Sequence, residues 1–149
     1  MPNKPTYEIR LRTADDYLNG LPEVTDIVSP SRPIIEGNAA RIHDLTGSAV
    51  YRFVAVDGEQ VIGTATLVTH AKLLHNGSKA GQIEDVAVLP EYQHKGVGSK
   101  LLEACKQQAK DAGCYKVQLQ CDSENIVAEF YRANGFCGTR YLTMRWDCG

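Results

Sequence analysis

The chain has 149 residues, a length that suits one domain, and 43% of them are hydrophobic, which is enough for a sizeable core. The formal net charge of −2 argues against a nucleic-acid-binding protein, which would usually carry a basic patch, but it leaves small anionic ligands open. The 5 cysteines are odd in number and contain no Cys-x-x-Cys pair, so we expect reduced thiols rather than a disulfide framework.

The sequence indicates neither a metal-binding site nor a membrane-spanning segment. The 4 histidines form no metal-ligand spacing with the cysteines, so we expect no metal. The N-terminal stretch lacks the apolar segment of a secretory signal, and no apolar run reaches the ~18 residues of a membrane span. We therefore expect a cytoplasmic or other reducing intracellular location, with no membrane and no nucleic-acid partner.

The first half of the chain predicts a strand, helical segments and a hairpin. Residues 7–12 alternate like a strand, with Tyr7, Ile9 and Leu11 on one face. Pro33 suits the first turn of a helix that continues to Leu45. Residues 50–56 and 60–69 are strands joined by the strong turn signal Asp57-Gly58, and residues 72–80 form a polar loop.

The second half predicts alternating strands and helices. A strand at 82–88 is followed by an amphipathic helix from Val97 to Ala112, which Gly113 ends. Further elements are a strand at 116–121, a helix at 125–134 and a final strand or strand pair at 136–146. The hairpin makes the middle of the sheet antiparallel, and the strand–helix–strand units favour parallel pairing, so we expect a mixed α/β sheet.

The most informative segment is Gln93-His94-Lys95-Gly96-Val97-Gly98, which lies between a strand and a helix. Two glycines at a helix start let backbone N–H groups approach an anion such as a pyrophosphate. A P-loop is excluded because Ser99-Lys100 follows Gly98, and the dinucleotide fingerprint is excluded because position 101 is Leu. Taken alone, the segment could also be a flexible strand–helix turn.

Three motifs together are specific for a known family. The loop 93–98 follows Ile83-Glu84-Asp85-Val86-Ala87-Val88, and Asn125 precedes Phe130-Tyr131-Arg132-Ala133-Asn134-Gly135-Phe136. This combination, over about the C-terminal half, resembles the GNAT superfamily of acetyl-CoA-dependent N-acetyltransferases. The resemblance implies an α/β GNAT fold, with a central mixed, mostly antiparallel β-sheet flanked by α-helices, in a single domain spanning residues 1–149.

A narrower resemblance covers the chain from the hairpin to the C-terminus. The segments Lys72-Leu73-Leu74-His75, Gly113-Cys114-Tyr115-Lys116, Leu119-Gln120-Cys121-Asp122 and Leu142-Thr143-Met144-Arg145 are similar to those of the glucosamine-6-phosphate N-acetyltransferases. This similarity implies acetylation of glucosamine 6-phosphate, a step toward UDP-N-acetylglucosamine. It also implies a homodimer with shared active sites, in which the C-terminal strands contribute to the partner's site.

The resemblance assigns a role to each matching residue. Acetyl-CoA would be held through its pantetheine arm by Val86, Ala87 and Val88. Its remaining contacts would come from the pyrophosphate loop and the last helix: Gln93, His94, Lys95, Gly96, Val97, Gly98, Asn125, Tyr131 and Arg132. Tyr131 would face the thioester sulfur.

The narrower resemblance also implies a set of contacts to the acceptor sugar. The implied substrate contacts are Lys72, Leu73, Leu74, His75, Glu84, Asp85, Val86, Tyr115, Lys116, Gln120 and Arg145. The implied catalytic residues are Glu84, Asp85, Asp122 and Tyr131. Ordinary alternatives remain: the cations could be solvated surface charges, Tyr131 could be core packing, and one of Glu84 and Asp85 is expected to face the core.

One position departs from the resembled family. Between Leu119 and Cys121 the related enzymes usually carry an acidic residue that engages the amine, and this chain has Gln120. A neutral amide cannot take a proton, so Asp122, Glu84, Asp85 or water would have to act instead. Two other functions stay open: acetylation of a different amine, on a protein or a small molecule, and a non-catalytic acetyl-CoA-binding module.

Overall fold

The computed structural model describes residues 6–27, 49–72, 78–122 and 126–149. The chain divides into two compact units, Met1–Leu119 and Gln120–Gly149, which are described in turn. The first unit contains β1 (Tyr7–Leu11), η1 (Ala14–Tyr17), α1 (Leu21–Thr25), β2 (Val50–Asp57), β3 (Gln60–Ala71), β4 (Lys79–Val88), η3 (Pro90–Tyr92), α3 (Val97–Asp111) and β5 (Cys114–Gln118). The second contains α4 (Ile126–Ala133).

The five strands form one mixed sheet in the order β1-β2-β3-β4-β5. Neighbours are antiparallel from β1 to β4, and β4 and β5 are parallel, as the strand–helix–strand pattern predicts. The predicted strand at 116–121 begins two residues earlier and ends three earlier, and the predicted loop 72–80 is shortened because Lys79 and Ala80 pair with β3. The helix predicted after Pro33 lies outside the described residues.

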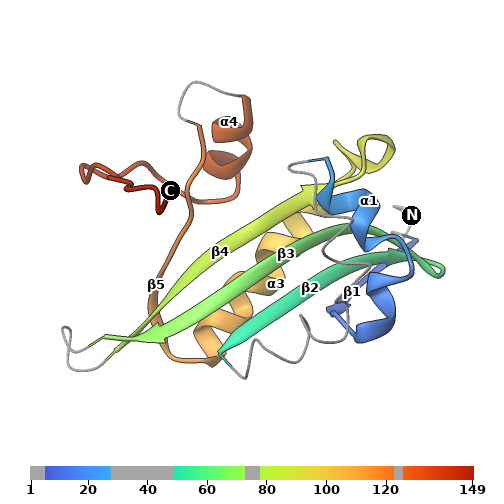
Figure 1. Ribbon diagram of the computed structural model, residues 1–149, viewed down its shortest axis with the longest axis horizontal. Coiled ribbons are helices and arrows are strands. Elements are labelled where there is room, and N and C mark those ends of the chain that lie inside the picture. Colours follow the sequence, from blue (N-terminus) through green and yellow to red (C-terminus); the bar gives the residue numbers. More distant parts are fainter. Residues whose placement is uncertain (1–5, 28–48, 73–77, 123–125) are drawn as a thin grey trace. The chain divides into compact units, whose positions relative to one another are not determined.

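Helix α3 packs across one face of this sheet, where Figure 1 shows it behind the strands. Its buried side chains recur at helical spacing, namely Val97, Leu101, Leu102, Cys105 and Ala109. A Cβ on Gly63 of β3 would meet Leu101 at 3.1 Å and Val97 at 3.3 Å, so this glycine allows the close approach of helix and strand. Gly113, at φ +80°, follows the end of α3 as predicted.

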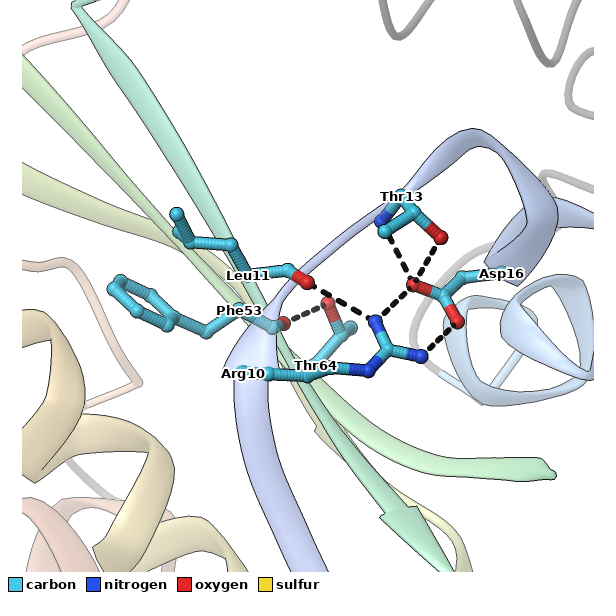
Figure 2. Close-up of polar contacts among 6 residues, drawn as sticks. All are labelled: Arg10, Leu11, Thr13, Asp16, Phe53 and Thr64. Carbon is cyan, nitrogen blue, oxygen red and sulfur yellow. Dashed lines mark hydrogen bonds and ion pairs between the residues drawn. The ribbon is translucent and has the colours of Figure 1, made fainter. Parts of the chain in front are cut away.

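A partly buried ion pair links η1 to β1. Figure 2 shows the guanidinium of Arg10 donating to both carboxylate oxygens of Asp16, at 2.7 and 2.8 Å. The same carboxylate accepts from the backbone N–H of Thr13 at 2.8 Å, and Asp16 is only 2% exposed. A carboxylate with this many donors is well compensated for its burial.

The second unit differs from the sequence-based expectation. Helix α4 confirms the helix predicted at 125–134 within the residues described. The strand predicted at 136–146 is wrong for this chain by itself, because residues 136–149 form no helix or strand. Strands need a partner for their backbone groups, and the apolar side chains of Tyr141, Leu142, Met144 and Trp146 are at least 75% exposed here.

The described helices include none that is long and apolar enough to cross a membrane. All five cysteines are free thiols in the structure, and burial raises the pKa of Cys105 to about 12. A thiol with this pKa is protonated at neutral pH, so Cys105 serves as a small apolar side chain in the core.

We predict that Asp16→Asn lowers the free energy of unfolding by about 2 kcal/mol near pH 7. The loss of stability is smaller than for a fully buried pair because the Arg10 side chain is one third exposed. Burial opposes the charge of Asp16, but the hydrogen bonds from Arg10 and Thr13 outweigh it and lower the pKa of the carboxyl. A carboxyl whose pKa falls on folding stabilises the protein above its unfolded pKa of about 3.9 and loses this effect as the pH drops through the folded value.

Urea denaturation near pH 7 and near pH 3 tests this prediction. The gap between wild type and Asp16→Asn should shrink at the lower pH, while the exposed neighbour variant Asp15→Asn should differ little from wild type at either. A gap of equal size at both pH values would contradict the assignment of the stability to this ionised pair.

Candidate functional site

The candidate site begins at a β-bulge in β4. Thr66 lies opposite Glu84 and Thr64 lies opposite Ala87, so two residues of β4, Asp85 and Val86, face one residue of β3. Asp85 adopts φ +55°, a left-handed conformation that non-glycine residues rarely take. Glu84 and Asp85 are both exposed. The expectation that one of them faces the core is wrong, because the extra residue breaks the alternation of the strand.

Beyond the bulge, one edge of β4 is left open by its neighbour. The ladder between β4 and β5 ends at the pair Gln82–Gln118, whereas β4 continues to Val88. Along residues 83–88, β4 therefore has no β5 partner in the described part of the chain. A strand edge of this kind can pair with the amide groups of an extended ligand, and Val86, Ala87 and Val88 lie on it, as the sequence interpretation requires.

The open edge leads directly into the glycine loop before α3. Gly96 is the N-cap at φ +84°, no side chain caps the helix, and its first turn has no acidic residue. The first N–H groups of a helix have no partner within it and carry a partial positive charge. Together they form a site suited to an anion.

Two side-chain hydrogen bonds hold this loop in place. Gln93 donates through Nε2 to the carbonyl of Val88 at 3.0 Å, and the hydroxyl of Tyr92 donates to Asp57 at 2.7 Å. His94 adopts φ +59° and, like Lys95, is exposed. Val97 is 1% exposed, so only its backbone, and not its side chain, is available to a ligand.

Glu84, Asp85 and Val86 of the predicted acceptor-binding set lie at the bulge, whereas Tyr115 and Lys116 lie beside the other end of β4. Lys116 is opposite Ala80 of β4. Ala80 and Glu84 are about 13 Å apart along the strand, at about 3.3 Å per residue. Its Nζ donates to Gln118 at 2.8 Å and lies 5.5 Å from the ring centroid of Tyr115. Lys72 is half-buried, and Leu73, Leu74 and His75 lie outside the described residues.

The second unit carries the remaining predicted residues. Tyr131 is half-buried between Phe130 and Phe136, with ring centroids at 5.1 and 6.1 Å, and burial raises the pKa of its hydroxyl. Arg132 pairs with Glu129 at 2.7 Å, and Arg145 pairs with Asp147 at 2.9 Å. Gln120 and Asp122 are exposed, and Asn125 lies outside the described residues.

Several buried polar residues of the sheet were not singled out from the sequence, among them Arg12 and Thr66. Arg12 is 9% exposed and Thr66 is 4% exposed, and both lie on strands or strand ends of the first unit. The strand alternation contained the signal for Arg12, because it places Arg10 and Arg12 together on the face opposite Ile9. No group of three or more potential metal ligands occurs among the described side chains.

Comparison with known proteins gives consistent matches. The family described as the acetyltransferase (GNAT) family matches residues 21–136. A probable glucosamine 6-phosphate N-acetyltransferase of Drosophila melanogaster is 27% identical over 99% of this chain and 70% of its own length. A glucosamine 6-phosphate N-acetyltransferase of Trypanosoma brucei brucei is 36% identical over 87% of this chain and 88% of its own length.

Solved structures match the fold of this chain as well. The crystal structure of glucosamine-6-phosphate N-acetyltransferase from Arabidopsis thaliana superposes with a TM-score of 0.86 at 26% identity, covering 95% of this chain and 99% of that chain. The mixed sheet with flanking helices is thus a GNAT fold, as the resemblance implies.

We predict that Asp85→Gly is more stable than Asp85→Ala by about 1 kcal/mol, because only glycine adopts φ +55° without strain. Both variants remove the carboxylate, so the comparison isolates the backbone conformation. At Glu84, which does not have a positive φ, the Gly variant should instead be the less stable. Urea denaturation of the four variants measures this, and the same order at both positions would contradict a bulge centred on Asp85.

Proposed function

Because the chain belongs to the acetyltransferase (GNAT) family, we propose that it transfers the acetyl group of acetyl-CoA to the amine of D-glucosamine 6-phosphate. The products are N-acetylglucosamine 6-phosphate and CoA, a step toward UDP-N-acetylglucosamine. The observation that carries the proposal is the open edge of β4, which continues into an uncapped helix N-terminus. The names of the relatives in Drosophila, Trypanosoma and Arabidopsis support the choice of acceptor.

Acetyl-CoA would bind along this continuous surface. Its pantetheine amides would pair with the edge Val86–Val88 as an added strand, and its pyrophosphate would accept hydrogen bonds from the N–H groups of the loop 93–98. Asn125, Tyr131 and Arg132 would complete the contacts. Among the described residues no side chain caps the N-terminus of α3, so its N–H groups would bind an anion without reorganisation.

The acceptor would lie against the bulge. The exposed carboxylates of Glu84 and Asp85 suit the amine or hydroxyl groups of a sugar. Its phosphate would be bound by Lys72, His75, Lys116 and Arg145, the cationic or imidazole side chains at the positions that the resemblance assigns to the sugar phosphate. A polyamine acceptor would instead require an acidic site, so these cations favour a phosphorylated acceptor.

The chemistry needs no covalent enzyme intermediate. The neutral amine attacks the thioester carbonyl, the tetrahedral intermediate collapses, and the C–S bond breaks. The amine loses one proton and the departing thiolate gains one. The raised pKa of Tyr131 keeps its hydroxyl protonated at neutral pH, which suits a donor to the thiolate. Glu84, Asp85 or Asp122, or a water held by them, would take the proton from the amine.

We also propose that the enzyme is a homodimer with shared active sites and that residues 1–149 form one domain. The exposed apolar side chains of Tyr141, Leu142, Met144 and Trp146 support a dimer, because pairing with a second chain would bury them. The free cysteines suit a reducing compartment such as the cytoplasm.

The pyrophosphate assignment predicts that Gly96→Val raises the KM for acetyl-CoA at least about tenfold, because a branched side chain would obstruct the N–H groups and strain φ +84°. The matched control is Gly58→Val, which places the same side chain at φ +59° in the hairpin turn. Steady-state kinetics should show the increase for Gly96→Val alone. An unchanged affinity for CoA in folded Gly96→Val would defeat the assignment.

Because the neutral amide of Gln120 cannot accept a proton, we predict that Gln120→Ala lowers kcat/KM less than about tenfold. Removal of a general base typically costs about 10²–10⁴-fold, so at least one of Glu84→Gln, Asp85→Asn and Asp122→Asn should lose far more. A pH–rate profile of the four variants decides between them. If Gln120→Ala were the most damaged, the proton route proposed here would be wrong.

The acceptor phosphate predicts that glucosamine 6-phosphate exceeds glucosamine in kcat/KM by at least about a hundredfold. Each charge-assisted hydrogen bond is worth about 1.5–3 kcal/mol, and a heavily discounted loss of about 3 kcal/mol corresponds to this ratio. Arg145→Ala should narrow the gap by harming the phosphorylated substrate. A coupled thiol-release assay over a panel of amines measures both effects.

Mixed dimers of Arg145→Ala and Glu84→Gln protomers extend this test to the shared site. If Arg145 acts on the partner's substrate, mixing the two variants should restore part of the activity that each lacks alone. Equal acetylation of glucosamine and its 6-phosphate would move a protein amine or another small amine ahead as acceptor. Binding of acetyl-CoA without turnover of any amine would favour a non-catalytic module.

A further inference from the structure

One side-chain hydrogen bond ties the segment before α3 to the end of the β2–β3 hairpin. The hydroxyl of Tyr92, the last residue of η3, donates to Oδ2 of Asp57 at 2.7 Å, across 35 positions of the sequence. A hydroxyl that donates to a carboxylate makes a shorter and stronger bond than one between neutral groups. The bond of Gln93 to Val88 holds the loop to its own strand, whereas the bond of Tyr92 holds it to β2.

Asp57 is a firm anchor because its backbone pairs with both neighbouring strands. It lies opposite Tyr7 of β1 and opposite Gln60 of β3. Opposed residues of antiparallel strands share a face, so the side chains of Asp57 and Tyr7 lie on the same side of the sheet. This is the side that α3 covers, because Ala55, two residues before Asp57, is opposite Gly63, the glycine against which α3 packs.

The other end of the loop lies against the same pair of strands. The hydroxyl of Tyr7 is 3.9 Å from the position that a Cβ would take on Gly96, the N-cap of α3. Between the two ends, His94 has φ +59°, and a non-glycine residue keeps such a conformation only where its surroundings hold it. The shape of the loop therefore depends on the strand end that carries Tyr7 and Asp57.

We propose that Tyr92 is a positioning residue of the acetyl-CoA site, whose hydrogen bond to Asp57 holds the loop in the shape that presents the N–H groups of α3 to the pyrophosphate. Asp57 is the anchor and not a ligand contact, since a carboxylate repels a pyrophosphate. The inference rests on the proposed function, in which this loop binds the pyrophosphate of acetyl-CoA. It gives a role to two side chains that the resemblance leaves without one.

Two acetyl donors separate this role from general damage to the fold. S-acetylpantetheine has the thioester and the amide arm of acetyl-CoA but no pyrophosphate. Tyr92→Phe removes the hydroxyl and keeps the ring, which lies 5.7 Å from Nζ of Lys95. It should lower kcat/KM about fivefold with acetyl-CoA and less than about twofold with S-acetylpantetheine. An equal loss with both donors would overturn the proposal, because such damage does not act through the anion site.

A double-mutant cycle tests whether Asp57 is the partner. Asp57→Ala should also lower kcat/KM with acetyl-CoA about fivefold, and Tyr92→Phe should add less than about twofold in that background. Asp57→Asn keeps an oxygen that accepts the hydroxyl and should be milder than Asp57→Ala. A Tyr92→Phe loss that persists in full beside Asp57→Ala would overturn the pairing. The comparison of donors requires no change at the hairpin, so it decides the proposal even where Asp57→Ala does not fold.

Tyr51→Phe is the matched control, since it removes a hydroxyl from the opposite end of β2. It should leave kcat/KM within about twofold of wild type with both donors. A fivefold loss with acetyl-CoA in this control would contradict a role specific to Tyr92.

Binding of CoA, measured by isothermal titration calorimetry, separates this inference from the proposed function because it requires no acceptor. Tyr92→Phe should raise the Kd for CoA about fivefold, and Tyr51→Phe less than about twofold. An unchanged Kd in folded Tyr92→Phe would overturn the role of Tyr92 even if glucosamine 6-phosphate is acetylated. A raised Kd in a protein that acetylates no amino sugar would instead reject the proposed acceptor and support the role of Tyr92.

Discussion

The extra residue in β4 is the constraint on which the proposed site depends. Strands β3 and β4 pair on both sides of the bulge, so the inserted residue cannot slip away along the ladder. Its consequence is that two consecutive carboxylates, Glu84 and Asp85, both reach solvent on a strand whose other side chains are largely buried. A regular strand would have turned one of them toward α3 or toward α1.

The bulge also places the two proposed ligands on different parts of one strand. Upstream of the bulge, β4 pairs with both β3 and β5. Downstream, among the described residues of the first unit, β4 pairs with β3 alone and leads through Val88 into the loop. The hydrogen bonds of Gln93 to Val88 and of Tyr92 to Asp57 fix that loop against the strand end and the hairpin. In the proposed function, the amide arm of acetyl-CoA would lie on this edge and its pyrophosphate at the loop, beside the exposed carboxylates of Glu84 and Asp85.

Most of the fold could be predicted from local pattern. Alternation predicted β1, the Asp57-Gly58 turn predicted the hairpin of β2 and β3, and the spacing from Val97 predicted α3, because each signal is local in the sequence. The bulge could not be predicted, since the positive φ of Asp85 depends on how β4 pairs with β3. The strand or strand pair expected at 136–146 failed for a related reason: the local sequence can favour an extended segment, while formation of a strand requires a partner edge. The loop motif located the candidate anion site, whereas Arg12 became visible only once burial and register were known.

The central claim is that acetyl-CoA lies along the open edge of β4 and ends at the N-terminus of α3. Hydrogen–deuterium exchange of the backbone amides, with and without acetyl-CoA, tests it most directly. We expect slower exchange in residues 83–88 and 94–99 when acetyl-CoA is present, with the hairpin turn at residues 57–60 unchanged. Protection that is absent from both segments while acetyl-CoA is bound would contradict it.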